Sequence, residues 1–169
     1  MAVLPIVLWP DPRLSQICAP VQADEDLRAL AQDMLDTMYD APGRGLAGPQ
    51  VGVMKRIFVM DVTWKEGVPD PVICLNPRIT ARSDAVATRA EGCLSIPGIQ
   101  TDVTRPETVT LDWTDLDGVA RSADLTGFAA TCAQHELDHL DGLVTFDRLD
   151  PEARATAQAG YDIVRGAGA

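Results

Sequence analysis

The segment Gln134-His135-Glu136-Leu137-Asp138-His139 contains both histidines of the chain, in the pattern H-E-x-x-H. Its surroundings, residues 128–143, predict a helix that ends at Gly142 or soon after it. Residues four apart share one helix face, so both imidazoles can reach one metal ion while Glu136 points toward a bound water. The spacing therefore predicts a divalent metal site on this helix.

The position of the two histidines on the helix favours this interpretation over a solvated pair. Phe128, Cys132, His135 and His139 fall on one helical stripe, which predicts that both imidazoles face the interior. The alternative, two surface histidines beside an acid, is open because short motifs occur by chance. Buried histidines without a partner would be costly, and a metal supplies one.

A catalytic metal usually takes three protein ligands, so a third ligand must lie elsewhere in the chain. Upstream, Cys93 stands in Glu91-Gly92-Cys93-Leu94-Ser95, beside a glycine that permits close backbone approach, and its thiolate would complete a His₂Cys site. The remaining cysteines are expected to pack as small hydrophobic residues: Cys18, Cys74 and Cys132. The downstream alternatives are carboxylates: Asp141, Asp147, Asp150, Glu152 and Asp162.

The rest of the chain predicts helices and strands without regular alternation. A helix with an acidic start at residues 24–26 should end near 42–43, and strands are expected at 57–60 and 72–75. Residues 109–114 and 119–125 predict a hairpin around a turn at 115–118, and the tail 161–169 is expected to fray. We therefore expect an α+β fold, with mostly antiparallel strands packed around the central H-E-x-x-H helix.

Length and composition bound the class of protein. The chain has 169 residues, which fits one domain over 1–169, and its 14 basic and 25 acidic residues give a net charge of −11. That charge argues against direct nucleic-acid binding and against binding to an anionic membrane surface. The N-terminus lacks the pattern of a signal peptide, and no apolar run approaches about 20 residues, so a soluble cytoplasmic protein is expected.

Three motifs in this order resemble those of the peptide deformylases. They are Gly43-Arg44-Gly45-Leu46-Ala47-Gly48-Pro49-Gln50, Glu91-Gly92-Cys93-Leu94-Ser95 and Gln134-His135-Glu136-Leu137-Asp138-His139. The resemblance extends over about residues 5 to 148, including Pro10-Asp11-Pro12-Arg13-Leu14. It implies removal of the N-formyl group from the initiator methionine of nascent polypeptides, with release of formate.

The resemblance also implies roles for particular residues. Cys93, His135 and His139 would hold one divalent metal, Fe(II) in the cell and replaceable by Zn(II), Ni(II) or Co(II). Glu136 would take a proton from the attacking water and pass one to the departing amine. The oxyanion donors would be the Gln50 side-chain amide and the Leu94 backbone N–H, and the Gly45 backbone would pair with the peptide substrate.

Some positions depart from the family pattern. Gly48 stands where a second alanine is usual, which would give that loop more freedom. Residues 99–101 lack the arginine that many deformylases place along the substrate groove, and the C-terminal segment is not basic enough to predict a stable contact with ribosomal RNA. Any ribosome contact would be transient. Near the metal, Glu91 and Arg105 are expected to form an ion pair.

Three other functions are open at this point. A deformylase paralogue acting on another N-formyl or N-acyl amine is suggested by Gly48 and the missing groove arginine. A binding or regulatory module could keep the metal without turnover, although metal retention would not require Glu136. A zincin endopeptidase with a downstream carboxylate ligand predicts that a Cys93→Ala variant keeps its metal.

Overall fold

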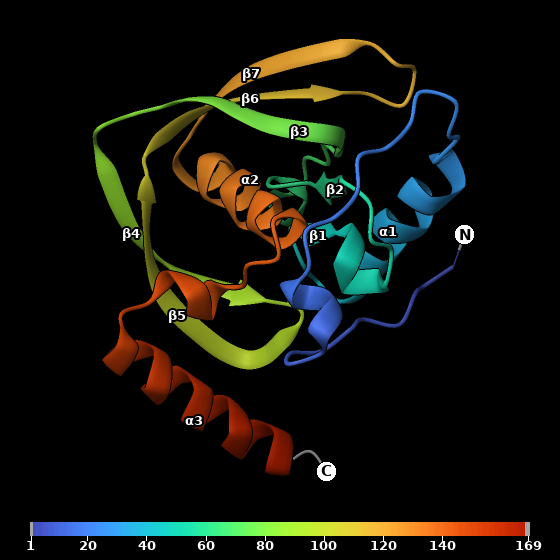
Figure 1. Ribbon diagram of the computed structural model, residues 1–169. Helices are drawn as coiled ribbons and strands as arrows, with labels where there is room; N and C mark the ends of the chain where they lie inside the picture. Colours follow the sequence, from blue (N-terminus) through green and yellow to red (C-terminus); the bar gives the residue numbers. More distant parts are fainter. Residues whose placement is uncertain (1, 168–169) are drawn as a thin grey trace.

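The computed structural model describes residues 2–167 and shows the predicted α+β fold. Helix α2 (Gly127–Leu140) runs through the centre, with a five-stranded sheet on one side and a two-stranded sheet on the other (Figure 1). The other helices are α1 (Arg28–Asp40), α3 (Pro151–Ala167) and four short 3-10 helices: η1 (Pro12–Ser15), η2 (Gly48–Val51), η3 (Trp64–Glu66) and η4 (Thr145–Arg148). The strands are β1 (Gly45–Ala47), β2 (Ile57–Met60), β3 (Val72–Arg82), β4 (Val86–Cys93), β5 (Ile96–Pro106), β6 (Thr108–Thr114) and β7 (Ala120–Thr126).

The large sheet has the order β1-β2-β3-β6-β7, and each neighbouring pair is antiparallel. The predicted strand 57–60 is confirmed as β2, and the predicted hairpin is confirmed as β6 and β7. The strand expected at 72–75 continues to Arg82 as β3. The prediction of mostly antiparallel strands is therefore confirmed.

Helix α2 is buried along most of its length, because elements pack on several of its sides. Every residue from 130 to 140 is buried, which includes the polar side chains of the H-E-x-x-H motif. The predicted stripe is wrong at one position, since Phe128 in the first turn is 42% exposed. Within residues 2–167, no helix is long and apolar enough to cross a membrane.

Helix α1 begins later than its acidic residues predict. Its first residue is Arg28, its N-cap position is Leu27, and no acid lies in its first turn. The Asp26 carboxylate instead accepts a hydrogen bond from the Arg28 backbone N–H at 3.1 Å, within the turn before the helix. Such a local side-chain hydrogen bond stabilises a turn in competition with the first helical turn.

Strands β4 and β5 form a hairpin that the sequence pattern did not predict. Their side chains alternate in burial over much of the length, but many of the alternating positions are charged or small. The register shifts between Gly92 and Cys93, where the hairpin turns. Periodicity is a weak signal for such a hairpin because the interior it faces is polar.

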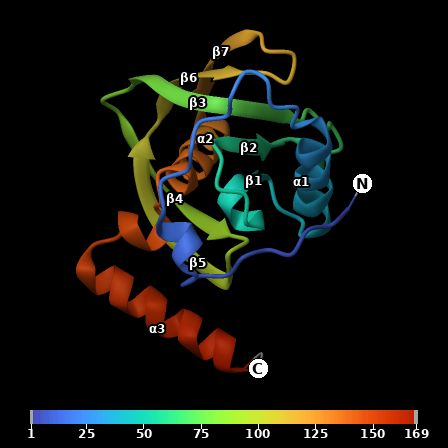
Figure 2. The ribbon, with the colours of Figure 1, turned by 45° about the vertical axis from the view of Figure 1, so that its right-hand side comes forward.

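Helix α3 includes most of the C-terminal segment that the sequence predicts to fray. It runs to Ala167, so residues 161–167 of the expected tail are helical, and residues 168–169 lie outside the described part. Figures 1 and 2 both show α3 lying along β5 on the outside of the fold. Tyr161 is fully buried, packs against Trp9 and Phe146, and donates a hydrogen bond to the Trp9 carbonyl at 2.9 Å.

Candidate metal centre and substrate pocket

The two histidines and Cys93 converge although they come from separate elements. Cys93 is the last residue of β4, and the histidines lie one turn apart on α2. The His139 Nε2 atom lies 3.4 Å from the Cys93 Sγ and 3.3 Å from the His135 Nε2. One ligand atom from each residue lies within 4.8 Å of the other two. All three side chains are buried, so a metal here would be largely shielded from bulk water.

This donor set fits a divalent metal. Two imidazole nitrogens and one thiolate suit Zn(II), Fe(II), Co(II) or Ni(II), and three protein ligands leave room for a water. Burial, with His135 nearby, lowers the pKa of His139, which favours the neutral imidazole that binds metals. The downstream carboxylates lie elsewhere: Asp141 pairs with Arg56, and Asp147 pairs with Arg154. Within residues 2–167, the third residue of the cluster is therefore Cys93.

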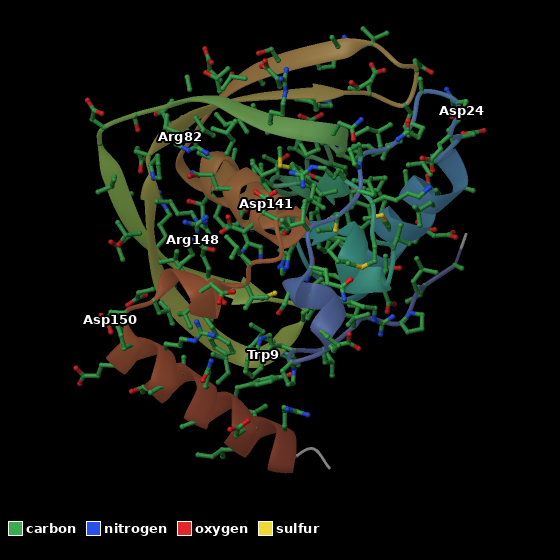
Figure 3. All side chains as sticks on the ribbon, in the orientation of Figure 1. Trp9, Asp24, Arg82, Asp141, Arg148 and Asp150 are labelled. Atoms are coloured by element: carbon green, nitrogen blue, oxygen red, sulfur yellow. The ribbon has the colours of Figure 1, made fainter. Side chains whose placement is uncertain are left out.

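A network of charged side chains holds the His135 ring through its Nδ1 atom. This Nδ1 lies 2.9 Å from Glu91 Oε1, and Arg105 donates to both oxygens of Glu91 at 2.7 and 3.0 Å. The predicted Glu91–Arg105 pair is thus confirmed. Arg105 also donates to Asp138 at 2.9 Å, and Arg148 donates to both Asp138 oxygens at 3.0 and 2.6 Å. Figure 3 shows Arg148 beside α2, and its partly exposed side chain is the member of this network nearest to solvent.

The charge state of Glu91 suits this role. Burial by itself would raise its pKa, but the hydrogen bonds from His135 and Arg105 outweigh burial and lower the pKa below its ordinary value. Glu91 is therefore a carboxylate that accepts from the His135 Nδ1–H, which leaves Nε2 free as a ligand atom.

Glu136 lies beside the Cys93–His135–His139 cluster without belonging to it. It is 4% exposed, and burial raises its pKa to about 7. Its Oε1 lies 4.0 Å from the His135 Nε2, and its buried Oε2 has no hydrogen-bond partner. A Cβ atom added at Gly45 would lie 2.5 Å from Glu136 Oε1 and 2.9 Å from its Cγ. The missing side chain at Gly45 therefore provides the space that the Glu136 side chain occupies.

Gln50 is oriented by hydrogen bonds on both sides of its amide group. Its Oε1 accepts from the Ala47 backbone N–H at 2.9 Å, and its Nε2 donates to Ser95 Oγ at 3.1 Å. The same Nε2 lies 3.6 Å from the Cys93 Sγ. The amide nitrogen is thus held between Ser95 and Cys93, at the edge of the cluster. Leu94 follows Cys93 in the turn between β4 and β5.

A pocket of about 940 Å³ opens beside these residues. Its walls come from residues 41–45, the β4–β5 hairpin and one face of α2. Six of the seven predicted site residues line it: Gly45, Gln50, Cys93, Leu94, His135 and Glu136. The seventh, His139, is 1% exposed and lies behind them. The structure thus places the predicted residues around one cavity.

Two expectations about glycines are wrong. A Cβ at Gly48 would lie 2.6 Å from the Val53 carbonyl oxygen and 2.9 Å from that of Lys55, so this position is tightly enclosed and gives the loop no extra room. At Gly92 an added Cβ would meet no atom within 4 Å, so close backbone approach does not explain the glycine beside Cys93. The glycine that is crowded against Glu136 is Gly45.

Comparison with known proteins decides the family. A family model described as polypeptide deformylase matches residues 3–155. The chain belongs to the polypeptide deformylase family. A peptide deformylase from Alkalilimnicola ehrlichii is 50% identical over 150 residues, covering 88% of this chain and 83% of the relative. One from Rhizobium meliloti is 44% identical over 150 residues, covering 88% of this chain and 86% of the relative.

Solved deformylase structures share the fold. The crystal structure of a peptide deformylase from Legionella pneumophila superposes with a TM-score of 0.91 at 38% identity, covering 99% of this chain and 98% of that one. A Synechococcus elongatus deformylase in complex with actinonin gives a TM-score of 0.88 at 36% identity, covering 95% and 88%. These deformylases give no support to the alternative of a paralogue with a different formylated substrate.

Sequence reasoning missed several side chains that surround the site. Ser95 is fully buried and accepts from Gln50, and Asp138 links Arg105 to Arg148. Asp138 could have been found, because it lies inside the H-E-x-x-H motif and one turn from His135. No sequence pattern pointed to Arg148, because its contact with Asp138 depends on how η4 packs against α2.

Proposed function

We propose that this chain removes the N-formyl group from the N-terminal methionine of newly made polypeptides, adding one water and releasing formate and a free amine. The observation that carries the proposal is the position of Glu136, which lines the pocket beside Cys93 and His135 of the cluster and has one buried oxygen without a hydrogen-bond partner. Membership of the deformylase family and the shared fold support the same reaction.

The three ligand residues would hold one divalent metal, Fe(II) in the cell, with Zn(II), Ni(II) or Co(II) as replacements. Such a metal supplies Lewis acidity and lowers the pKa of water at its open position. Glu91 keeps the His135 ring in place through the hydrogen bond at Nδ1. Arg105 holds Glu91 with two hydrogen bonds, so the ligand geometry is set before substrate binds.

Glu136 would act as the base and then as the acid. Its pKa of about 7 lets one carboxylate accept a proton from the attacking water and then return a proton to the departing amine near neutral pH. The packing against Gly45 fixes where the carboxylate lies. Water attack on the formyl carbon and cleavage of the carbon–nitrogen bond thus depend on one positioned side chain.

Gln50 and Leu94 would stabilise the negative charge that forms on the formyl oxygen. The amide of Gln50 is held by Ala47 and Ser95, so its N–H donors need little reorganisation as the charge develops. The Leu94 backbone N–H would supply a second donor. Gly45, on the edge strand β1, would hydrogen-bond the peptide backbone of the substrate.

Further proposals concern the setting of the reaction. The partner would be an N-formylmethionyl nascent peptide in the cytoplasm, with at most a transient ribosome contact and no direct nucleic-acid binding. The net charge of −11 supports this, because a strongly acidic protein is repelled by ribosomal RNA. We also propose that residues 1–169 act as one domain.

The test is formate release from a formyl-Met peptide by protein purified anaerobically with Fe(II) or Ni(II). Glu136→Ala should keep the metal and lose turnover, whereas Cys93→Ser should lose both. Metal content would be measured by mass spectrometry on the same preparations. Absence of formate from metal-loaded wild type would refute the proposed function. Full metal retention by Cys93→Ser would refute the ligand assignment.

A further inference from the structure

The mouth of the pocket carries a charge pattern opposite to that of the whole protein. Four charged residues line the pocket, and two of them, Glu91 and Glu136, are buried. The other two are the cations Arg44 and Lys65. A chain with a net charge of −11 thus presents basic side chains where a substrate would enter.

Arg44 is held in a defined position at this mouth. Its Nη2 donates to Glu66 at 2.8 Å, and its guanidinium lies 5.1 Å from the centre of the Phe128 ring. The Nε of Arg44 has no hydrogen-bond partner. Phe128, whose exposure departs from the predicted stripe, therefore serves as a platform for the arginine at the start of α2.

Lys65 belongs to a segment that is anchored to the same wall. Its neighbour Trp64 donates from Nε1 to the Gly43 carbonyl at 2.8 Å and packs edge-on against Tyr39. The Nζ of Lys65 lies 5.7 Å from the centre of the Trp64 ring. Within residues 2–167, Lys65 has no acidic side chain in ion-pair contact, so its charge is available to a ligand.

On the opposite wall of the pocket, the one charged lining residue is Glu91, which is buried and paired with Arg105, so no exposed acid there balances these cations. This wall is formed by the end of β4 and the start of β5, where the side chains of Pro97, Ile99 and Gln100 are uncharged. The positive side of the groove therefore lies on the Gly43–Gly45 wall. Complementary charge at such a mouth selects among ligands mainly by attracting one sign and repelling the other.

We propose that Arg44 and Lys65 determine substrate specificity, favouring formyl-Met peptides that carry an Asp or Glu side chain within the next two residues. This inference rests on the proposed function. Exposed ion pairs contribute modestly, so two such cations should favour an acidic peptide over its amide counterpart by roughly 2- to 10-fold in kcat/KM. Glu66 opposes the effect because it neutralises part of the charge on Arg44.

The experiment compares matched peptides on the metal-loaded enzyme: formyl-Met-Asp-Ala-amide against formyl-Met-Asn-Ala-amide, and formyl-Met-Ala-Asp-amide against formyl-Met-Ala-Asn-amide. Each pair differs in charge at nearly constant shape. The wild-type Asp/Asn ratio of kcat/KM should exceed one in at least one pair and fall toward one as salt rises from about 0.05 to 0.5 M. Lys65→Gln should lower this ratio, and Glu66→Gln should raise it.

Lys55→Gln is the matched control, because it removes the other lysine of the chain, which pairs with Glu25 outside the pocket. It should leave the Asp/Asn ratio at the wild-type value. The specificity inference would be overturned by ratios at or below one for both peptide pairs, or by ratios that Lys65→Gln and Glu66→Gln leave unchanged. In either case, turnover of the peptides would still uphold the proposed function. Failure to deformylate any of the four peptides would overturn both.

Discussion

Replacement of Gly45 by alanine should separate catalysis from stability at this site. The new Cβ would lie 2.5 Å from Glu136 Oε1, whereas ordinary van der Waals contact begins at 3.4 Å. The carboxylate must therefore retreat by about 0.9 Å, the difference between these distances. A misplacement of about 1 Å can reduce a rate by roughly 10²-fold, so kcat should fall by about that factor.

The fold should tolerate the same change. The atoms nearest to the new methyl group belong to the Glu136 side chain, which can rotate away, and the backbone groups of Gly45 are retained. A glycine-to-alanine change at a compatible backbone position alters stability by only about 0.4–1 kcal/mol. The two histidines and Cys93 should stay in place, so metal content and KM should change little.

The assay is formate release from a formyl-Met peptide, followed with metal analysis and urea unfolding of the same samples. Gly166→Ala is the control, because a Cβ there meets no atom within 4 Å and the residue lies at the far end of α3. Wild-type kcat in metal-loaded Gly45→Ala would refute the argument that Gly45 makes room for Glu136. Loss of metal or of folding would instead show that the methyl group disturbs the ligands.

Three further predictions concern the surrounding structure. Arg105→Ala should lower the free energy of unfolding by about 3–5 kcal/mol and reduce metal content, because it leaves the buried Glu91 carboxylate without its cation and Asp138 paired with Arg148 alone; unchanged urea midpoint and metal content would contradict the ion-pair interpretation. Tyr161→Phe should cost about 1 kcal/mol in unfolding free energy through loss of the hydrogen bond to the Trp9 carbonyl, and an unaltered value would mean that this bond adds nothing to the docking of α3. Hydrogen bonds from Arg13 lower the pKa of Asp11 to about 2, so Arg13→Ala should return it toward about 3.9 in an NMR titration. The Asp11–Arg13 pair of the wild type stabilises the fold at pH values above the unfolded-state pKa of Asp11, and this contribution is lost as pH falls through about 2. If Arg13→Ala does not raise the pKa of Asp11, the pairing is contradicted.

Local patterns predicted the elements whose burial follows a simple period. Residues 57–60 are apolar throughout and form the buried strand β2, and the alternation at 109–114 matches one strand of the β6–β7 hairpin. The β4–β5 hairpin was not predicted, because it covers an interior of charged groups such as Glu91 and Arg105. Helix α3 was also missed, since the burial of Tyr161 depends on contact with Trp9 near the other end of the chain.

By itself, the sequence determined the part of the site that is local in the chain. The spacing of His135, Glu136 and His139 places them on neighbouring turns of one helix whatever surrounds it, and the three motifs indicated the family. The motif around Cys93 predicted the third member of the cluster, but only the tertiary structure showed that this thiol from β4 meets the two imidazoles, because helical geometry says nothing about a distant strand. The same holds for the space that Gly45 leaves for Glu136 and for the cations that Arg44 and Lys65 place at the pocket mouth. Both depend on strands and turns that meet through packing, and packing is not encoded in any single stretch of sequence.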